Sequence, residues 1–428
     1  MKLPSEKNRF ELVVCSTVVF ALLAFPACDE ASDSSASASI ESCFGLRALL
    51  GTDEPMPGRR YVGANGFEFA SLAGVTLSQA DVEQCESLES SALALVTSGA
   101  PGASLAYRTS RFQVRMARGL ADTAAGVPLR PDALLRVASV AKPYLGALAA
   151  LLATEGRLDL DNTDGAHTLA DYLPQTVGRI EYADRITVRQ LLNHTSGVPD
   201  YFGEAIGPAW ITHVLDSHRR GRGVTEDEAL ELVYGTPADF EPGTAGNYSN
   251  TGYLLAARVL DRVLGHSYTE AIHDRFLAPL ALDETYFEKH DAFDLTRLSH
   301  GYRDASELGQ SFSDWFEVDQ GYGFANGGVV ARVDQVAAFF RAVPGGRALP
   351  QGIRSEPFLA ALRPSDSPGY GSGIQRSDDC YFHGGTFAGY SSVAFHCVAR
   401  DVTGALFINS SVPEHEAALT VLSEDLMR

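Results

Sequence analysis

The sequence predicts an α/β fold of the α+β type, in which an antiparallel sheet is flanked by helices and interrupted by a mainly helical domain. Segments of strand-like composition occur near both ends of the chain, at residues 103–107, 112–116, 370–375, 380–384, 391–398 and 404–410. The last four follow one another with short turns, and such connections join antiparallel strands. We expect the sheet part at about 78–145 and 325–428, and the helical part at about 146–324.

Helical periodicity supports this division of the chain. It predicts helices at residues 78–97, 139–154, 187–193 and 253–264. The third of these opens with a capping box formed by Thr187 and Gln190, and the fourth stops at Gly265. Most of the segment between 160 and 320 is therefore expected to be helix and loop.

The first 28 residues are predicted to be an export signal. Its basic start contains Lys2, Lys7 and Arg9. An uncharged run from Leu12 to Ala27 follows, and it is shorter than the roughly 20 apolar residues that a membrane-spanning helix needs. A Ser-, Ala- and Asp-rich stretch after Cys28 resembles the tether of a bacterial lipoprotein, so Cys28 is a candidate for lipidation. Ordinary signal cleavage is the alternative.

The signal places the protein in the cell envelope of a bacterium, either periplasmic or anchored as a lipoprotein. Residues 29–77 are interpreted as a flexible tether and an N-terminal extension to which the sequence assigns no structure. The remaining residues, 78–428, would form a single domain.

Composition limits the kinds of binding partner that we expect for this protein. A formal net charge of −20 repels phosphate backbones, so nucleic acid is not expected as a partner. The sequence contains no CxxC or HExxH motif, and we expect neither a metal nor a cofactor. Residues 159–165 superficially resemble a calcium loop, but the glycine comes one position late and we interpret the segment as an acidic loop. A small-molecule or peptide substrate and a monomeric chain are expected.

Cysteines predict two disulfides in an oxidising compartment. Beyond the signal the chain has Cys43, Cys85, Cys380 and Cys397. If Ala388 and Gly389 form the turn between two predicted strands, Cys380 and Cys397 stand directly opposite each other, close enough to bond. A bulge in the first strand would shift this register by one residue. By elimination Cys43 would pair with Cys85, and buried free thiols are the alternative.

Ser139 and Lys142 are the first candidates for catalysis. Residues three apart on a helix share a face, so the hydroxyl and the amine can meet. A serine hydroxyl needs a neighbouring base, and a buried lysine, unlike an arginine, can lose its proton to serve as one. The start of the helix also offers the Ser139 amide to a developing oxyanion. The spacing alone also arises by chance.

Tyr248 and Asn250 form the second candidate element, in a loop shaped by glycine and proline. A nearby lysine ammonium would lower the pKa of Tyr248, so that its phenolate could accept a proton. Asn250 could donate to a substrate carbonyl or orient Lys142. Alternatively, Tyr248 only packs on its neighbours and Asn250 caps the helix that follows.

The third element is His383-Gly384-Gly385-Thr386, on a predicted strand. Two glycines weaken a strand, so their presence suggests that another group must approach the strand backbone closely. A substrate lying along this edge could use the Thr386 N–H as a second oxyanion donor, and His383 would face the substrate or the path of the proton. A histidine buried in the core is the alternative.

Together these elements resemble the penicillin-recognising serine hydrolases, which include class C β-lactamases, D-Ala-D-Ala carboxypeptidases and related esterases. The resemblance covers about residues 90–410 and rests on motifs in the order 101–104, 136–142, 191–198, 248–250, 327–329 and 383–385. It implies a β-lactamase/transpeptidase-like fold. It also implies that the enzyme is a serine hydrolase that works through an acyl-enzyme.

The resemblance assigns a role to each matching residue. Ser139 would be the nucleophile, with Lys142 and Tyr248 as the base pair. The amides of Ser139 and Thr386 would form the oxyanion hole. The expected substrate contacts are Asn250, His383, Gly384 and Gly385.

One departure from the family pattern bears on the substrate. β-Lactamases of this class usually carry lysine where this chain has His383, and a histidine is mostly neutral at pH 7. The sequence therefore favours hydrolysis of a D-amino-acid peptide, an ester or an amide over efficient β-lactamase activity. The alternative from another class is a penicillin-recognising surface receptor or sensor with little turnover.

Overall fold

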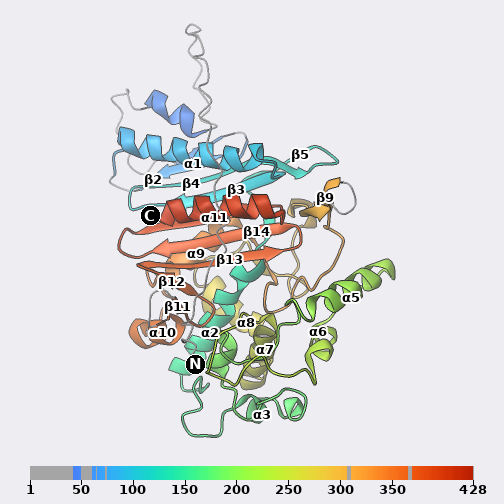
Figure 1. Ribbon diagram of the computed structural model, residues 1–428. Helices are drawn as coiled ribbons and strands as arrows, with labels where there is room; N and C mark the ends of the chain where they lie inside the picture. The colour runs from blue at the N-terminus through green and yellow to red at the C-terminus, as the bar shows by residue number, and fades with distance from the viewer. Residues whose placement is uncertain are drawn as a thin grey trace, which may run out of the picture. The chain divides into compact units, whose positions relative to one another are not determined.

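Ten strands of the described part of the chain form one sheet, and neighbouring strands in it are antiparallel. Their order is β1 (Arg60–Val62), β2 (Glu68–Ser71), β4 (Phe112–Asp122), β3 (Gly102–Arg108), β15 (Val402–Ile408), β14 (Tyr390–Cys397), β13 (Cys380–Phe387), β12 (Gln375–Ser377) and β11 (Gly369–Tyr370), with β5 (Val127–Pro128) paired to β4. Because β3 pairs with β15, strands from the two ends of the chain lie side by side (Figure 1). The predicted antiparallel sheet is confirmed.

The structure is a computed structural model that describes residues 42–49, 60–63, 65–72, 75–305, 310–364 and 369–427. All of them belong to one unit that spans Ser39–Arg428. The predicted export signal, its Cys28 and the tether at 29–39 lie outside the described residues. Within the described residues, no helix is both long enough and apolar enough to cross a membrane.

Helices cover both faces of the sheet. α1 (Gln79–Thr97) and α11 (Pro413–Met427) pack on one face, and α9 (Val333–Ala342) packs on the other (Figure 1). Successive side chains of β3 point to opposite faces of the sheet. Leu105 is buried in the core shared with α1, and Ala106 is buried in the core shared with α9.

The remaining elements build the mainly helical part and its connections. The helices are η1 (Cys43–Leu49), η2 (Ala138–Ala141), α2 (Lys142–Thr154), α3 (Leu169–Tyr172), η3 (Pro174–Thr176), α4 (Val188–Leu192), α5 (Gly207–Arg219), α6 (Glu226–Val233), α7 (Asn250–Leu264), α8 (Tyr268–Ile272), η4 (His273–Leu277), η5 (Leu295–Arg297) and α10 (Ser355–Leu362). A small sheet has the order β6 (Leu134–Arg136), β10 (Val329–Arg332) and β7 (Thr285–Phe287), and β8 (Tyr302–Ala305) pairs with β9 (Gln310–Asp314).

Three segments differ from the expectation. Residues 370–375 are not one strand, because Gly373 takes a φ of +77° and turns the chain against the Lys142 carbonyl. The helix predicted from Ser139 begins as the 3-10 turn η2 and becomes α-helical at Lys142. Residues 42–72, to which the sequence assigned no structure, supply η1, β1 and β2, and so extend the sheet beside β4.

Both predicted disulfides are present. Cys380 and Cys397 are partners across β13 and β14, with their Cα atoms 3.9 Å apart, and no bulge shifts the register. Cys43 and Cys85 join η1 to α1 over a sequence separation of 42 residues. The second bond therefore ties the N-terminal extension to the helix that covers the sheet.

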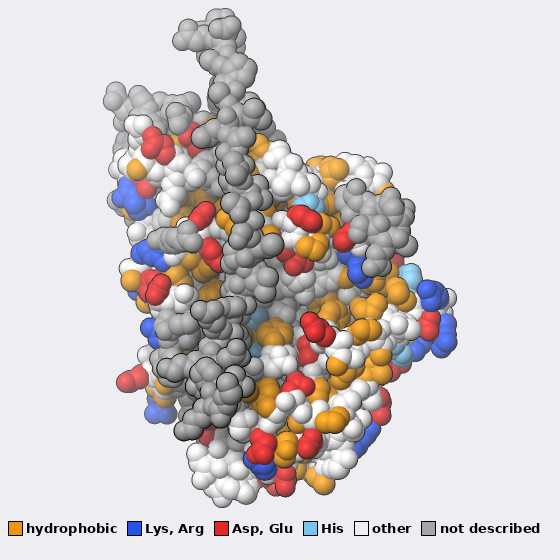
Figure 2. All heavy atoms as spheres, in the orientation of Figure 1, with side chains coloured by type: hydrophobic (Ala, Val, Ile, Leu, Met, Phe, Trp, Pro, Cys, Tyr) orange, Lys and Arg blue, Asp and Glu red, His pale blue; other side chains and the backbone are white. Residues whose placement is uncertain are grey.

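In Figure 2, acidic and basic side chains are interspersed over the described atoms of this side of the molecule. The net charge of −20 is the excess of 54 acidic over 34 basic side chains in the whole chain.

Strand β13 passes very close to the turn that carries Ser139. A Cβ atom on Gly385 would lie 2.7 Å from the Val137 carbonyl oxygen and 2.8 Å from the Ser139 nitrogen. A Cβ atom on the adjacent Gly384 would have its nearest neighbour at 3.9 Å, because it points to the other face of the strand. The predicted close approach to the strand backbone thus exists at Gly385 and not at Gly384.

We expect Gly385→Ala to lower the free energy of unfolding by about 1–3 kcal/mol, because backbone atoms on both sides must move apart. Gly384→Ala is the matched control and should leave stability unchanged or raise it slightly, since the site is open and alanine reduces the entropy of the unfolded chain. Urea unfolding of the two variants measures the difference. Equal stabilities would contradict the close packing at Gly385.

Candidate active site

Ser139 lies on a strained turn at the end of β6. Ala138, immediately before it, has a φ of +49°, which is unfavourable for a residue other than glycine. Ala138 is fully buried in a small cluster with Tyr322, Phe387 and Tyr390, and this packing holds the turn in place. Ser139 itself is half-buried, so its hydroxyl is held by rigid structure while one side remains accessible.

Lys142 lies in the first turn of α2 with its side chain completely buried. Its Nζ donates to Ser139 Oγ at 3.0 Å, to Asn250 Oδ1 at 2.8 Å and to the Asn326 carbonyl at 2.7 Å. The predicted meeting of Ser139 and Lys142 therefore occurs.

Burial lowers the pKa of Lys142 to about 7, although the negative charge of Asp200 partly opposes this effect. Two of the three atoms around Nζ are amide oxygens, which can only accept. A neutral amine would therefore direct its two N–H groups at Asn250 and Asn326, and its lone pair would remain for Ser139. This geometry suits a base that takes the proton from the Ser139 hydroxyl.

Asn250 connects Lys142 to a buried carboxylate. Its backbone N–H donates to Asp200 Oδ1 and its Nδ2 donates to Asp200 Oδ2, both at 3.0 Å. Because Nδ2 points at a carboxylate, Oδ1 must be the atom that faces Lys142. Asn250 also opens α7, which begins three residues before the predicted helix because Ser249 caps it. Of the two roles foreseen for Asn250, the orientation of Lys142 is the one its contacts support.

Tyr248 lies beside Lys142, with Nζ 4.9 Å from the centre of its ring. Burial raises the pKa of Tyr248 far above its ordinary value, and the nearby Ser139 hydroxyl lowers it by a smaller amount. The expected lowering by a lysine ammonium is not found, because burial raises this pKa and the negative charge of Asp200 acts in the same direction. The phenol therefore keeps its proton at neutral pH, and its oxygen lies near the Ser139 hydroxyl.

His194 fixes the Tyr248 ring from behind. The two ring centroids are 4.1 Å apart, and His194 Nδ1 accepts the Ser249 N–H at 3.1 Å. Burial and the charge of Lys142 lower the pKa of His194 well below its ordinary value, so the imidazole is neutral. His194 thus positions the loop that carries Tyr248.

The register of β13 leaves the Thr386 N–H on an open edge. Cys380 and Cys397 form a pair without mutual hydrogen bonds, as their short Cα separation of 3.9 Å shows. Such pairs recur at every second residue of an antiparallel ladder, and Thr386 with Ser391 is another of them. The Thr386 N–H therefore points away from β14. On that other side, β12 pairs with β13 only as far as Phe382. The position is suitable for an oxyanion donor beside the Ser139 amide.

His383 lies behind this edge and is only 2 % exposed. Its Nδ1 lies 2.5 Å from the Gly384 carbonyl, which can only accept, so its Nε2 accepts from the Tyr370 hydroxyl at 2.7 Å. Burial and the nearby Lys142 lower the pKa of His383 to about 3. The ring is neutral and both nitrogens have partners inside the protein, so contact with a substrate remains a prediction.

Asn326 and Asp200 were not identified from the sequence. Asn326 directly precedes the Gly327–Val329 motif, and Asp200 follows the 191–198 motif by two residues. Both contacts join segments far apart in the chain, so local spacing gave no signal for them. Asn326 also donates from Nδ2 to Asn250 Oδ1 at 3.1 Å, which completes the ring of groups around Lys142.

One cluster of potential metal ligands lies in and just after the acidic loop, away from these residues. Asp159, Asp164 and His167 are the described group at which three potential ligand atoms converge outside the disulfide region, and they belong to the acidic loop. Asp159 Oδ2 already accepts from Thr163, and Asp164 Oδ1 lies 2.7 Å from His167 Nδ1. Asp159, Asp164 and His167 are thus already engaged in contacts within this segment.

Comparison with known proteins agrees with the geometry. The family model described as Beta-lactamase matches residues 86–425. The chain is 32 % identical over 168 residues to penicillin-binding protein 4* of Bacillus subtilis, a match that covers 39 % of this chain and 33 % of that protein. It is 29 % identical over 234 residues to esterase EstB of Burkholderia gladioli, covering 54 % of this chain and 58 % of the esterase. These matches thus span between a third and three fifths of the relatives' lengths.

Solved structures share the fold. A D-stereospecific amidohydrolase from Streptomyces sp. has a TM-score of 0.63 at 27 % identity, covering 76 % of this chain and 94 % of that one. D-amino acid amidase from Ochrobactrum anthropi SV3 has a TM-score of 0.63 at 23 % identity, covering 79 % and 98 %, and shows likeness of fold alone. With a family match over most of its length, this chain belongs to the β-lactamase family of serine hydrolases.

Proposed function

We propose that the protein is an exported hydrolase that forms an acyl-enzyme at Ser139 and acts on a D-amino-acid peptide, an ester or an amide. The observation that carries this proposal is the Lys142 amine, fully buried and fixed by two amide oxygens so that its remaining position faces Ser139 Oγ at 3.0 Å. A nucleophile and a base whose pKa lies near the working pH are the parts that acyl transfer requires.

Acylation follows from these contacts. Neutral Lys142 accepts the proton of the Ser139 hydroxyl as Oγ bonds to the carbonyl carbon of the substrate. The negative charge on the carbonyl oxygen is received by the N–H groups of Ser139 and Thr386. As the bond to the leaving group breaks, the proton passes from Lys142 to the leaving atom, with the Tyr248 hydroxyl as a protonated relay between them. Water then releases the acyl group by the same steps in reverse.

The charges of the site favour neutral substrates. The Lys142 side chain is fully buried and its amine already has three partners within the protein. His383 is neutral, and both of its ring nitrogens have hydrogen-bond partners within the protein. Neither residue offers the permanent cation that would hold a substrate carboxylate. The esterase and D-stereospecific amidohydrolase relatives support the same choice, and the two disulfides together with the predicted N-terminal signal support export.

A substrate panel tests the proposed specificity. We expect a higher kcat/KM for p-nitrophenyl esters and D-amino-acid amides than for nitrocefin or benzylpenicillin. Intact mass after incubation with benzylpenicillin should show an adduct that reverts. An adduct that persists without turnover on any substrate would instead indicate a receptor.

Replacing Ser139 by alanine should abolish covalent labelling by a fluorophosphonate, because no other described group is placed to attack beside Lys142. Thermal unfolding should remain close to that of the wild type, since the side chain is small and half-buried. Labelling at full strength in Ser139→Ala would refute the assignment of the nucleophile.

We expect Lys142→Arg to reduce the rate of acylation about 10²–10⁴-fold, because arginine keeps the charge but cannot accept the proton. Lys289→Arg is the matched control, since Lys289 is the other described lysine and pairs with Asp319 at 2.6 Å on the surface. Its labelling rate should be unchanged. A Lys142→Arg enzyme that retains most activity would show that Lys142 serves only as a charge.

The rate of acylation should rise with pH through about 7, where the Lys142 ammonium gives up its proton. Below that value the protonated amine cannot act as a base, so the rate should fall about tenfold for each further pH unit. Labelling rates measured between pH 5 and 9 give the profile. A flat profile over this range would contradict a lysine base.

A further inference from the structure

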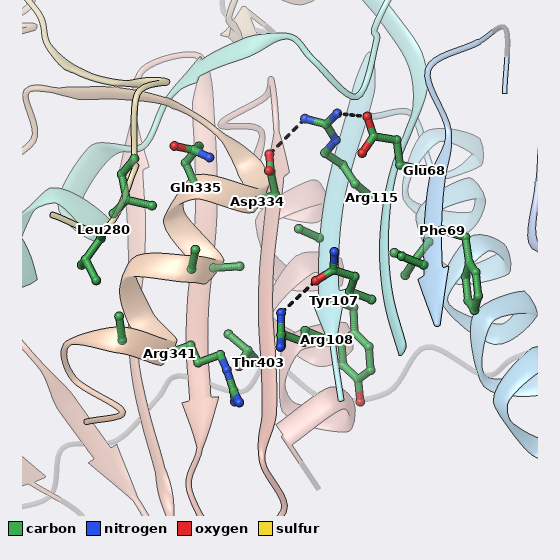
Figure 3. A pocket seen from close by; sticks show the side chains of 18 of the residues that line it. Glu68, Phe69, Tyr107, Arg108, Arg115, Leu280, Asp334, Gln335, Arg341 and Thr403 are labelled. Atoms are coloured by element: carbon green, nitrogen blue, oxygen red, sulfur yellow. Dashed lines mark hydrogen bonds and ion pairs between the residues drawn. The ribbon is translucent and has the colours of Figure 1, made fainter. Parts of the chain in front are cut away.

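A hollow of about 400 Å³ lies on the α9 side of the large sheet, between that helix and strands β2, β4 and β3 (Figure 3). It shares no lining residue with the site around Ser139. Its volume falls in the range of small-molecule sites, roughly 300–1,000 Å³. We call it the alanine-floored hollow, after the residues Ala70, Ala106, Ala337, Ala338, Ala342 and Ala348 that line it.

The hollow exists because the sheet is wider than its covering helix. α9 packs against β3, β14 and β15, whereas β4 and the added strands β1 and β2 continue beyond it. Alanines on both the helix and the sheet leave the space between them unfilled. An apolar floor of this kind favours contact with an apolar ligand surface.

Charged side chains surround this floor. They are Arg60, Glu68, Arg108, Arg115, Asp334 and Arg341. Arg60 pairs with Glu68, and Arg115 bridges Glu68 and Asp334 as Figure 3 shows. Arg341 pairs with Asp401, which lies just outside the lining. Four arginines thus face two lining carboxylates, in a chain whose net charge is −20.

Arg108 is the cation in this group that has no carboxylate partner among the described residues. Its Nη1 donates to the neutral Gln113 Oε1 at 2.9 Å, and its buried Nε has no partner. Burial and the positive charge of Arg341 lower its pKa, and Asp401 offsets this only in part. Figure 3 shows Arg108 and Arg341 at the same end of the hollow, on either side of Thr403.

We propose that the alanine-floored hollow binds a small monocarboxylate with an apolar body, whose carboxylate pairs with Arg108. One unpaired guanidinium calls for one negative charge, and its planar N–H groups match the two oxygens of a carboxylate. The apolar body would lie over Ala106 and Ala338, toward the end of the hollow that Leu280 and Leu282 line. No residue of the proposed acylation chemistry takes part.

Isothermal titration calorimetry with 3-phenylpropionate tests this site. The wild-type protein should bind it, while 3-phenylpropanamide, which has the same body without the charge, should not bind measurably. Inorganic phosphate should bind at least about tenfold more weakly, because it cannot use the alanine floor. Equal affinity for phosphate would overturn the requirement for an apolar body.

Two variants locate the binding site. Arg108→Gln removes the charge and should weaken binding about 10- to 100-fold. Ala338→Leu fills the hollow from an exposed position of α9, and should abolish binding without loss of folding. Arg219→Gln, at an exposed arginine on α5, is the matched control for loss of one positive charge.

Ser139→Ala separates this site from the catalytic one. Binding of 3-phenylpropionate should be the same in that variant as in the wild type. Binding that survives both Arg108→Gln and Ala338→Leu in folded protein, or that disappears in Ser139→Ala, would place the ligand elsewhere and overturn the proposal.

Discussion

The burial of one lysine amine is the constraint on which the site depends. A pKa held at about 7 in place of the ordinary 10.5 corresponds to roughly 5 kcal/mol against the ammonium form. The protein tolerates this because Lys142 has three partners, and the Asn250 oxygen among them is held in place by the contact between Asn250 and Asp200. The same burial that is costly for a charge makes the amine a base at neutral pH.

Asp200 shows how the protein balances this environment. Burial raises the pKa of Asp200 and lowers that of Lys142, so desolvation dominates for both groups. The Asn250 amide lies between them, with its nitrogen on the carboxylate and its oxygen on the amine. The two groups are therefore linked through the Asn250 amide and do not form a direct ion pair. A direct ion pair would favour the protonated form of Lys142.

Two parts of the large sheet, the strand β13 and the edge formed by β1 and β2, bear on the two proposed sites. At β13, a glycine lets the strand backbone reach the Ser139 amide, and beyond Phe382 no strand among the described residues pairs with its outer side. At the other end, β1 and β2 widen the sheet past α9 and leave the alanine-floored hollow. Both features arise where the regular cover of the sheet stops, and there backbone or side chains remain available to ligands.

The sequence by itself determined the features that depend on local spacing. Ser139 and Lys142 meet because residues three apart share a helical face, and Cys380 and Cys397 meet because a two-residue turn fixes the register of a hairpin. The order of strands and helices likewise predicted the antiparallel sheet.

Only the tertiary structure decided the features that depend on burial and on distant contacts. It identified Asn326 and Asp200, raised the pKa of Tyr248 where the sequence suggested a lower one, and turned His383 toward Tyr370. Desolvation is set by all the atoms packed around a group, and those atoms come from segments of the chain that no local pattern brings together.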